Sequence, residues 1–362
     1  MKKIKKIMTA VIVLLIIVAA GMYILLQTNL KAVDENNKKT IEVEIAGGTS
    51  TVIQQLDEAG LLKNSFFSKL YLKLNDYEFK ANTYVLDTSM DAKEIFKILE
   101  DAPINHIVTN SFTVIDGTTI VDYATAVGEV LGLSSQEVLN QWSDKSFLQD
   151  LIDEYWFLTD EILQEGIYYP LEGYLAANTY LVTNADMNLE KLTKVMLDQK
   201  AKELEQYRDQ MKNMVVDGKK LSIHEFLSLA SVVQAESLFE HDHAKIAGVF
   251  VHRMEYSGRE GTGGKLQSDV TVNYANQEVK VAVTYADLEV DSLYNTYLYP
   301  GIPVGPICAM NQAIIEATLN YEKTDNLFFF AIKGGDVIYT KTYQKHMNEI
   351  AKAKEAGLWL ED

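Results

Sequence analysis

An apolar run lies close to the amino terminus of the chain. The residues from Ile7 to Leu26 carry no charge, and lysines precede them. A run of about 20 apolar residues can cross the hydrocarbon core of a bilayer as a helix. The basic residues before the run, and the acidic Asp34 and Glu35 after it, favour an amino end inside and the rest of the chain outside. We therefore predict a cytoplasmic end at 1–6, a transmembrane anchor at 7–26 and a polar stalk at 27–40.

A cleaved signal peptide is the competing interpretation of this run. The small residues of Val18-Ala19-Ala20 have the form of a cleavage site. The apolar run continues beyond that site through Met22 to Leu26. The continuation favours an uncleaved single-pass anchor, with the protein held at the cell membrane and its larger part outside the cytoplasm.

A small unit of mixed structure is predicted after the stalk. Ile41, Val43 and Ile45 alternate with glutamates, and a period of two is typical of a half-buried strand. A second strand is expected at 84–86. Helices are expected at 52–59, 65–75 and 91–100. We place the limits of this α/β module at 41–103.

The remainder of the chain divides less clearly. A strand at 111–115, a turn at Asp116-Gly117 and helices at 119–131 and 135–142 predict a second small α+β subdomain at 104–158. The largest part, 159–362, contains the motifs described below. The fold class is therefore α+β: a transmembrane helix, a small α/β module and a larger mixed α+β domain.

A helix at 222–238 is the most informative stretch. Ser222 and Glu225 have the spacing of a capping box, in which each side chain accepts a hydrogen bond from a free backbone N–H at a helix start. Leu229, Val232, Val233 and Glu236 then follow at offsets of 0, 3, 4 and 7, which places them on one face of the helix. Gln234 faces elsewhere. Glu236 thus extends an apolar, inward-facing stripe.

A carboxyl on an apolar stripe is costly unless it is protonated, paired or placed at the floor of a cleft. Partial burial raises the pKa of a carboxyl, which suits a general acid working near neutral pH. The alternative is a structural glutamate paired with an arginine or a helix end. Glu240 lies one turn later, and we expect it to be a surface residue.

Composition excludes several functional classes. The net charge is −18, which argues against nucleic acid as a partner because phosphate contacts need clustered lysine and arginine. Cys308 is the single cysteine, so neither an intramolecular disulfide nor a cysteine-based zinc site is expected. The sequence His241-Asp242-His243 is interpreted as a solvated loop rather than a metal site.

Several strings resemble those of the MltG/YceG-like endolytic murein transglycosylases. The string LASVVQAES at 229–237 resembles the catalytic helix of that family, and residues 41–100 resemble its LysM-like module. Further strings agree in order and together span about half of the chain. They are LEGYLAANTY (171–180), IAGVFVHRM (246–254), LQSDVTVNYA (266–275), YNTYLYPGIPVGPI (294–307) and LFFFAIKGGDVIYTKTYQKH (327–346).

The chain departs from the family pattern at four places. Gln234 stands where many relatives have a glutamate, so the two-carboxylate string of the family is reduced to one. Ala177-Asn178 replaces a Pro-Asp pair, and Ala309-Met310-Asn311 replaces an Asn-Pro-Gly type of turn. Val337 stands where a histidine is often present.

The resemblance implies an endolytic lytic transglycosylase that acts on peptidoglycan glycan strands, without a cofactor or a metal, beside cell-wall synthases. Glu236 would protonate the oxygen between MurNAc and GlcNAc and then take the proton of the MurNAc 6-hydroxyl, leaving a 1,6-anhydro end. The alternative is a catalytically silent glycan-binding or scaffold protein of the cell-wall synthesis complex. The expected substrate-binding residues are Ser237, Gln267, Ser268, Asp269, Tyr294, Asn295 and Thr296.

Each of these residues also has a purely structural interpretation. Asp and Asn side chains commonly stabilise loops through hydrogen bonds with nearby backbone groups. Tyr294 and Tyr297 are candidates to stack on sugar rings, but both are equally consistent with core positions. The Ser237 hydroxyl is equally consistent with a hydrogen bond inside its own helix. Local sequence does not decide between the two roles.

Overall fold

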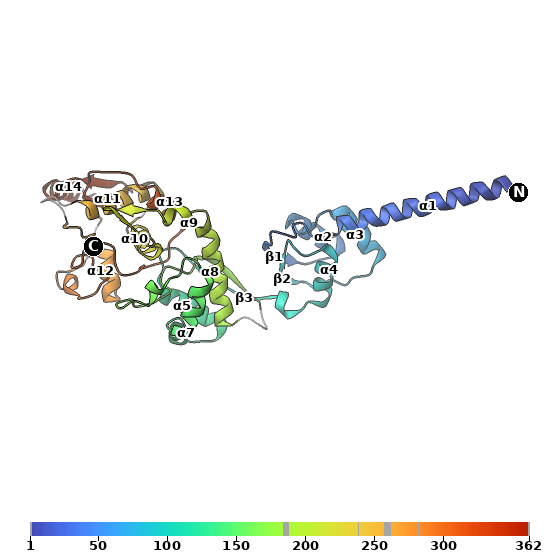
Figure 1. Cartoon of the computed structure of the whole chain (residues 1–362), viewed down its shortest axis with the longest axis horizontal. Helices are drawn as coiled ribbons and strands as arrows, with labels where there is room; N and C mark the ends of the chain where they lie inside the picture. Colours follow the sequence, from blue (N-terminus) through green and yellow to red (C-terminus); the bar gives the residue numbers. More distant parts are fainter. Residues whose placement is uncertain (1, 184–187, 238, 257–261, 281–282, 361–362) are drawn as a thin grey trace. The chain divides into compact units, whose positions relative to one another are not determined.

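The protein forms two compact units, described here from a computed structural model that covers residues 2–183, 188–237, 239–256, 262–280 and 283–360 (Figure 1). Both units contain helices and strands, which confirms a mixed α+β architecture. Unit 1 comprises Met1–Ser111 with Leu181–Met187, and unit 2 comprises Phe112–Tyr180 with Asn188–Asp362.

Unit 1 is built on an antiparallel strand pair in which Val43 lies opposite Tyr84. The strands and helices expected from the sequence are present here. The elements are α1 (Lys2–Asn29), β1 (Thr40–Ile45), α2 (Thr49–Glu58), α3 (Ser65–Leu74), β2 (Asn82–Asp87), α4 (Ala92–Asp101) and the 3₁₀ turn η1 (Ile104–His106).

The core of unit 1 follows from two sequence patterns. Alternation along β1 buries Val43 and Ile45. Helix α4 buries an apolar face, and the side chain of Asp91 caps its start by accepting a hydrogen bond from the Glu94 N–H. Ala102 ends the helix in the left-handed conformation, with φ of 50°.

Helix α1 enters the core of unit 1. Its segment Val11–Asn29 is long and apolar enough to cross a membrane, by length and composition. Leu26 and Leu30 are buried in the same hydrophobic cluster as β1, α2 and α4. The Leu30 carbonyl also accepts a hydrogen bond of 2.9 Å from the Ala92 N–H. The segment expected as a stalk therefore begins inside a helix and contributes to the core.

A further strand pair joins β3 (Val108–Val114) to β4 (Asn178–Thr183), and the division between the units passes through it. Side-chain hydrogen bonds link its two strands in addition to the backbone hydrogen bonds. Thr113 Oγ1 lies 2.8 Å from Thr179 Oγ1, and Thr109 Oγ1 donates to the Val182 carbonyl at 3.0 Å.

Unit 2 is assembled around helix α10 (Ile223–Glu236), against which three other helices pack, α11 (His243–Glu255), α12 (Asp269–Asn276) and α13 (Gln312–Leu319). Helix α14 (Tyr343–Glu355) packs on the antiparallel pair β7 (Phe328–Ala331) and β8 (Val337–Thr340). The remaining elements are α5 (Ile120–Leu131), α6 (Ser135–Gln141), α7 (Lys145–Glu154), η2 (Asp160–Leu163), α8 (Leu189–Glu205), α9 (Arg208–Met211), β5 (Val215–Val216), β6 (Lys219–Lys220), η3 (Glu240–Asp242) and η4 (Asp287–Glu289).

Gly248 sets the position of α11. A Cβ atom built on this residue would lie 1.9 Å from the Glu322 carbonyl oxygen, so only glycine allows this approach. The Glu322 N–H donates to the Ala244 carbonyl at 2.8 Å and holds the two segments together. This contact fixes the helix that carries Arg253 into the site described below.

The segment His241-Asp242-His243 is not the solvated loop expected from the sequence. Asp242 and His243 are buried, and Asp242 accepts a hydrogen bond of 2.9 Å from the Tyr339 hydroxyl. The segment is polar but packs against the β7–β8 pair, and sequence polarity alone did not indicate this tertiary partner. Among the described residues, no group of three or more His, Cys, Asp or Glu side chains is arranged to hold a metal ion.

Candidate active site

Helix α10 brings Glu236 to the site. The predicted capping box is present. Ser222 Oγ accepts a hydrogen bond of 3.1 Å from the Glu225 N–H, and the Glu225 carboxylate accepts one of 2.9 Å from the Ser222 N–H. Leu229, Val232 and Val233 are fully buried along the inward stripe. Glu236 continues that stripe as the last residue of the helix and is partly buried. The position expected from helical spacing is therefore confirmed.

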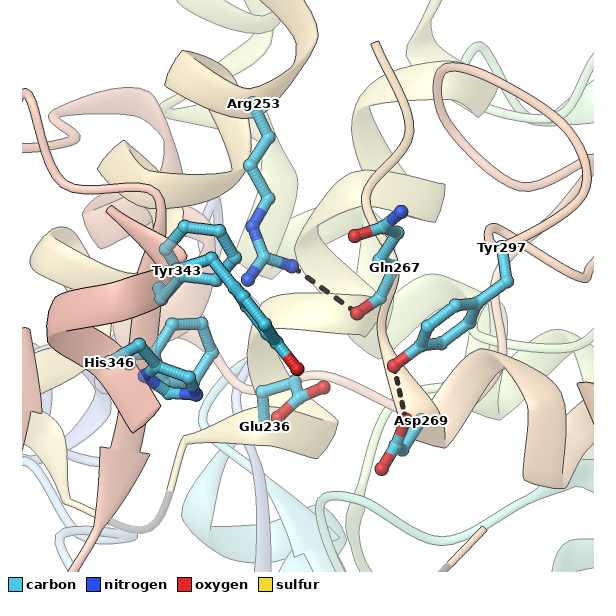
Figure 2. A pocket seen from close by; sticks show the side chains of 9 residues that line it. Glu236, Arg253, Gln267, Asp269, Tyr297, Tyr343 and His346 are labelled. Carbon is cyan, nitrogen blue, oxygen red and sulfur yellow. Dashed lines mark hydrogen bonds between the residues drawn. The ribbon is translucent and has the colours of Figure 1, made fainter. Parts of the chain in front are cut away.

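The side chain of Glu236 faces a cavity of about 330 Å³ in unit 2 (Figure 2). The lining comes from five separate parts of the chain: the ends of α10 and α11, the segment before and at the start of α12, a loop that contains Tyr297, and the β7–α14 region. The lining residues are Glu236, Arg253, Gln267, Asp269, Tyr297, Phe328, Phe329, Tyr343 and His346.

Ser268 orients the Glu236 carboxyl. Its hydroxyl donates a hydrogen bond of 2.5 Å to Glu236 Oε1. Ser268 is itself buried, and its N–H donates to Thr296 Oγ1 at 3.1 Å. The Thr296 hydroxyl also lies 2.8 Å from Thr271 Oγ1. Thr296 and Thr271 thus hold the backbone of Ser268 in place, and the Ser268 hydroxyl fixes one oxygen of the carboxyl.

Arg253 supplies a fixed positive charge on the cavity wall. Only 7% of its surface is exposed. Its Nε donates to the Leu327 carbonyl at 2.7 Å, and Nη1 donates to the carbonyls of Leu266 and Gln267. The guanidinium also lies 5.8 Å from the ring centre of Phe328, within the range of a cation–π contact. The cation is therefore held by neutral groups and acts on Glu236 from a distance.

The pKa of Glu236 is raised above the ordinary value of a glutamate. Burial is the largest cause, because it disfavours the charged form. The hydrogen bond from Ser268 and the charge of Arg253 lower the pKa in part, and Asp269 raises it. The net effect increases the fraction of carboxyl that is protonated near neutral pH. Such a group can both donate and accept a proton during a reaction.

A second carboxylate lines the same cavity. Asp269, the first residue of α12, is exposed and accepts a hydrogen bond of 2.6 Å from the Tyr297 hydroxyl. Burial and this hydrogen bond raise the pKa of Tyr297, so its hydroxyl stays protonated and acts as a donor. The pair adds polar groups to a lining that also contains the apolar rings of Phe328 and Phe329.

Sequence reasoning did not assign five of the lining residues. Arg253, Tyr343 and His346 lay inside strings that carried the family resemblance, but no local pattern gave them a role. Burial and the nearby charge of Arg253 lower the pKa of His346, so its ring is neutral near pH 7. Its Nδ1 is buried without a hydrogen-bond partner among the described residues. The aromatic residues Phe328 and Phe329 likewise lay inside such a string without an assigned role.

The structure divides the expected substrate-binding residues into two groups. Gln267 and Asp269 line the cavity, and Ser268 contacts the catalytic candidate directly. Gln267 has a φ of 49°, a left-handed conformation that turns the chain sharply before α12.

Four residues of that set lie behind the cavity wall. Asn295 is fully buried, and its Nδ2 donates to the carbonyls of Leu288 and Val290 at 2.9 Å each. Thr296 supports Ser268, as described above. Tyr294 is buried, with its ring centre 4.7 Å from that of Tyr274. Ser237 caps α10 through its N–H, which donates to the Val233 carbonyl at 3.0 Å.

Gln234 points away from the first cavity. Its Oε1 accepts a hydrogen bond of 3.1 Å from the Asn311 N–H, and the residue lines a second cavity of about 580 Å³ in unit 2. That cavity also contains Glu172, whose pKa burial raises to about 8. Glu172 accepts hydrogen bonds from the Ile120 N–H at 3.0 Å and from the Tyr274 hydroxyl at 3.0 Å. These bonds give Glu172 a structural role.

Comparisons with known proteins identify the family of the chain. The model of the YceG-like family matches residues 41–352. The chain belongs to the YceG-like family. An endolytic murein transglycosylase of Bacillus subtilis is 32% identical over 343 residues, which cover 94% of this chain and 91% of the relative. A Streptococcus pneumoniae protein of the same name is 29% identical over 372 residues, covering 96% of this chain and 65% of the relative.

A solved structure supports the YceG-like fold. The crystal structure of a YceG-like protein from Listeria monocytogenes superposes with a TM-score of 0.60 at 32% sequence identity. The match covers 86% of this chain and 100% of the other. The two chains therefore share a fold.

Proposed function

We propose that the protein is a lytic transglycosylase that cleaves the bond between MurNAc and GlcNAc in peptidoglycan strands, with Glu236 as the catalytic acid and base. One observation carries the proposal: a carboxyl with a raised pKa faces a cavity and is oriented by one hydroxyl donor. The names of the relatives agree with the substrate class.

The proposed reaction needs no water and no added group. Glu236 gives its proton to the glycosidic oxygen as the bond from that oxygen to C1 of MurNAc breaks. The carboxylate then takes the proton of the MurNAc 6-hydroxyl as that oxygen bonds to C1. Glu236 ends protonated, and the products are a free GlcNAc 4-hydroxyl and a 1,6-anhydro end. Ser268 holds the carboxyl in the orientation that both proton transfers require.

The charges around Glu236 suit this double role. The charge of Arg253 lowers the pKa of Glu236 and so opposes part of the effect of burial. The Tyr297 hydroxyl gives its proton to Asp269, so its oxygen accepts hydrogen bonds from sugar hydroxyls, and Gln267 offers an amide. The rings of Phe328 and Phe329 supply apolar surface against which a sugar face can pack.

Hydrolysis is the second candidate reaction, because Asp269 places another carboxylate in the cavity. Hydrolysing glycosidases use two carboxyl groups, one as an acid and one as a nucleophile or base. The two reactions differ in their products. Hydrolysis leaves a reducing end, whereas the proposed transfer leaves an anhydro end. Analysis of the ends released from purified glycan strands separates them, and Asp269→Asn should abolish only the hydrolytic reaction.

A silent glycan-binding scaffold is the alternative of a different class. Loss of the second glutamate at Gln234 favours it, whereas the raised pKa of Glu236 favours an enzyme. Glu236→Gln keeps the size of the side chain and removes its proton. We expect cleavage to fall by at least about 10²-fold, the low end for general acid–base catalysis. Glu240→Gln, at an exposed position, is the matched control and should retain activity.

If both variants cleave strands as fast as the native protein, Glu236 is not the acid. If the native protein releases no ends at all while still binding strands, the scaffold alternative holds. Thermal unfolding of both variants excludes misfolding as the cause of any loss.

We also propose the cellular setting. Helix α1 would anchor the protein in the cell membrane, with its amino end in the cytoplasm and the active site outside, near cell-wall synthases. Residues 41–103 would act as a LysM-like module, 104–158 as a second small subdomain and 159–362 as the catalytic domain. The apolar composition of α1 and the resemblance of these segments to the family support the arrangement.

A further inference from the structure

Helix α3 of unit 1 carries an outward face that its own unit does not cover. At 100° per residue, Phe66, Lys69, Leu70, Lys73 and Leu74 occupy an arc of about 140° on one side of the helix. Phe66 is 68% exposed and Leu74 is 71% exposed. The opposite side, with Phe67, Tyr71 and Leu72, packs against the hydrophobic core. We call the five outward residues the α3 face.

The composition of the α3 face is unusual for this protein. The chain has a net charge of −18, yet α3 contains two lysines and no acidic residue. Exposed Phe and Leu next to Lys are typical of helices that lie in the interface of a membrane, where the apolar side chains enter and the ammonium groups meet lipid phosphates. The charge of the α3 face therefore complements an anionic lipid surface.

The position of α3 next to α1 places this face at the expected level of the lipid headgroups. Helix α3 packs against α1. Along α1, Ile24 and Leu25 are exposed, whereas Leu26 and Leu30 are already in the core of unit 1. The apolar span thus runs into the folded unit with no linker between them. Because α3 touches α1 at this point, α3 lies next to the headgroups wherever α1 crosses a membrane.

Side-chain contacts hold this geometry. Lys93 Nζ donates to Gln27 Oε1 at 2.5 Å and lies 5.8 Å from the ring centre of Tyr71. The end of α1, the start of α4 and the inner side of α3 are therefore tied together. Unit 1 cannot turn the α3 face away from the membrane by rotating about a flexible stalk.

We propose that the α3 face is a membrane-contact surface, with Phe66 and Leu74 inserted at the level of the lipid headgroups and Lys69 and Lys73 bound to anionic lipid. The proposal rests on the proposed anchoring by α1 and is independent of the catalytic role of Glu236. Its consequence is that unit 1 is held at the membrane surface in one orientation.

Spin labels measure the depth of each position directly. Cys308 is the single cysteine and is buried, so an introduced surface cysteine can be labelled selectively. The full chain is reconstituted in vesicles that contain phosphatidylglycerol, with Phe66→Cys or Leu74→Cys. Leu14→Cys, within the apolar span, is the reference for immersion. Lys97→Cys, on an exposed part of α4, is the reference for water.

The expected result is a several-fold lower collision rate with a water-soluble nickel reagent at 66 and 74 than at 97, together with high access to oxygen. Collision rates with the nickel reagent that are as high at 66 and 74 as at 97 would overturn the proposal. Labels shielded from both reagents would also overturn it, because they would indicate contact with protein. An aqueous label at 14 would refute the anchoring itself.

The lysines are tested in the same system. Lys69→Glu with Lys73→Glu should return the label at 66 to water in phosphatidylglycerol vesicles, while the midpoint of thermal unfolding stays unchanged. An immersed label in this double variant would overturn the role of the lysines. Activity on soluble glycan strands should be the same in all of these variants, which separates this test from that of Glu236.

Discussion

Ser268 Oγ donates a hydrogen bond of 2.5 Å to Glu236 Oε1, although the two residues are 32 positions apart in the sequence. Glu236 ends one helix and Ser268 precedes the start of another. The carboxyl therefore has a defined orientation before any substrate binds. A preoriented proton donor needs less rearrangement during the reaction, which is a common source of catalytic efficiency.

Removal of the Ser268 hydroxyl should weaken activity and change its pH dependence. A hydrogen bond to a charged group is worth about 1.5–3 kcal/mol. This bond lowers the pKa of Glu236, so Ser268→Ala should raise that pKa and move the alkaline limb of kcat/KM to higher pH. Ser268→Thr keeps the donor and serves as the control. An unchanged limb in Ser268→Ala would show that the hydroxyl does not act on the acid.

The pH dependence of the free energy of unfolding should show the effect of burying the Glu236 carboxyl without any measurement of activity. Because burial raises the pKa of Glu236, the folded protein binds this proton more tightly than the unfolded chain does. The free energy of unfolding therefore falls as pH rises from the unfolded pKa, about 4.3, through the folded pKa. Glu236→Gln removes this loss. It should match the native protein near about pH 4 and be the more stable at neutral pH. The opposite order at neutral pH would indicate a structural ion pair.

Substitution of Arg253 should separate its charge from its hydrogen bonds. Arg253→Met removes the cation that lowers the pKa of Glu236, so the alkaline limb should move to higher pH. Arg253→Lys keeps the charge and should leave the limb in place. Both variants leave backbone carbonyls unsatisfied, at about 1–3 kcal/mol each, and should unfold at lower temperature. Identical pH profiles would assign Arg253 a structural role alone.

Gln267 and Asn295 should respond in opposite ways. Gln267 lines the cavity, so Gln267→Ala should lower kcat/KM several-fold, as expected for about 0.5–1.5 kcal/mol, with a small change in the midpoint of thermal unfolding. Asn295→Ala removes the Nδ2 donor from the carbonyls of Leu288 and Val290 and should lower that midpoint markedly. A stable but inactive Asn295→Ala protein would restore Asn295 as a candidate contact to sugar.

The mature amino terminus tests the anchor. The apolar run continues past the small residues at Val18-Ala19-Ala20, and α1 continues without a break into unit 1. We expect protein extracted from membranes to retain the whole of α1. Amino-terminal sequencing measures this, and a chain that begins at Gly21 would identify a cleaved signal peptide instead.

Local sequence was sufficient to predict the position of Glu236, since helical spacing alone placed it on the buried stripe of α10. The strands and helices of unit 1 were predicted for the same reason, because a period of two or of 3.6 is visible within a few residues. The chemistry of the site also followed from one side chain, because burial raises the pKa of a carboxyl wherever the fold places it.

The rest of the site depends on tertiary contacts. Arg253 and His346 come from α11 and α14, and nothing in either helix indicates that both face Glu236. Polar loop residues were equally ambiguous. Asp269 and Asn295 have similar local settings, yet one lines the cavity and the other holds a loop from within. Only the packing of distant segments distinguishes the two.

The burial of Leu26 and Leu30 determines how far the amino end can be shortened to obtain a soluble form of the protein. A chain that starts at residue 31 would lose both leucines from the core of unit 1. Each large apolar side chain removed from a core costs about 2–5 kcal/mol, which is comparable to the whole stability of a small domain. Soluble protein for crystallisation or assay should therefore begin before Leu26, with the exposed apolar residues upstream replaced by polar ones.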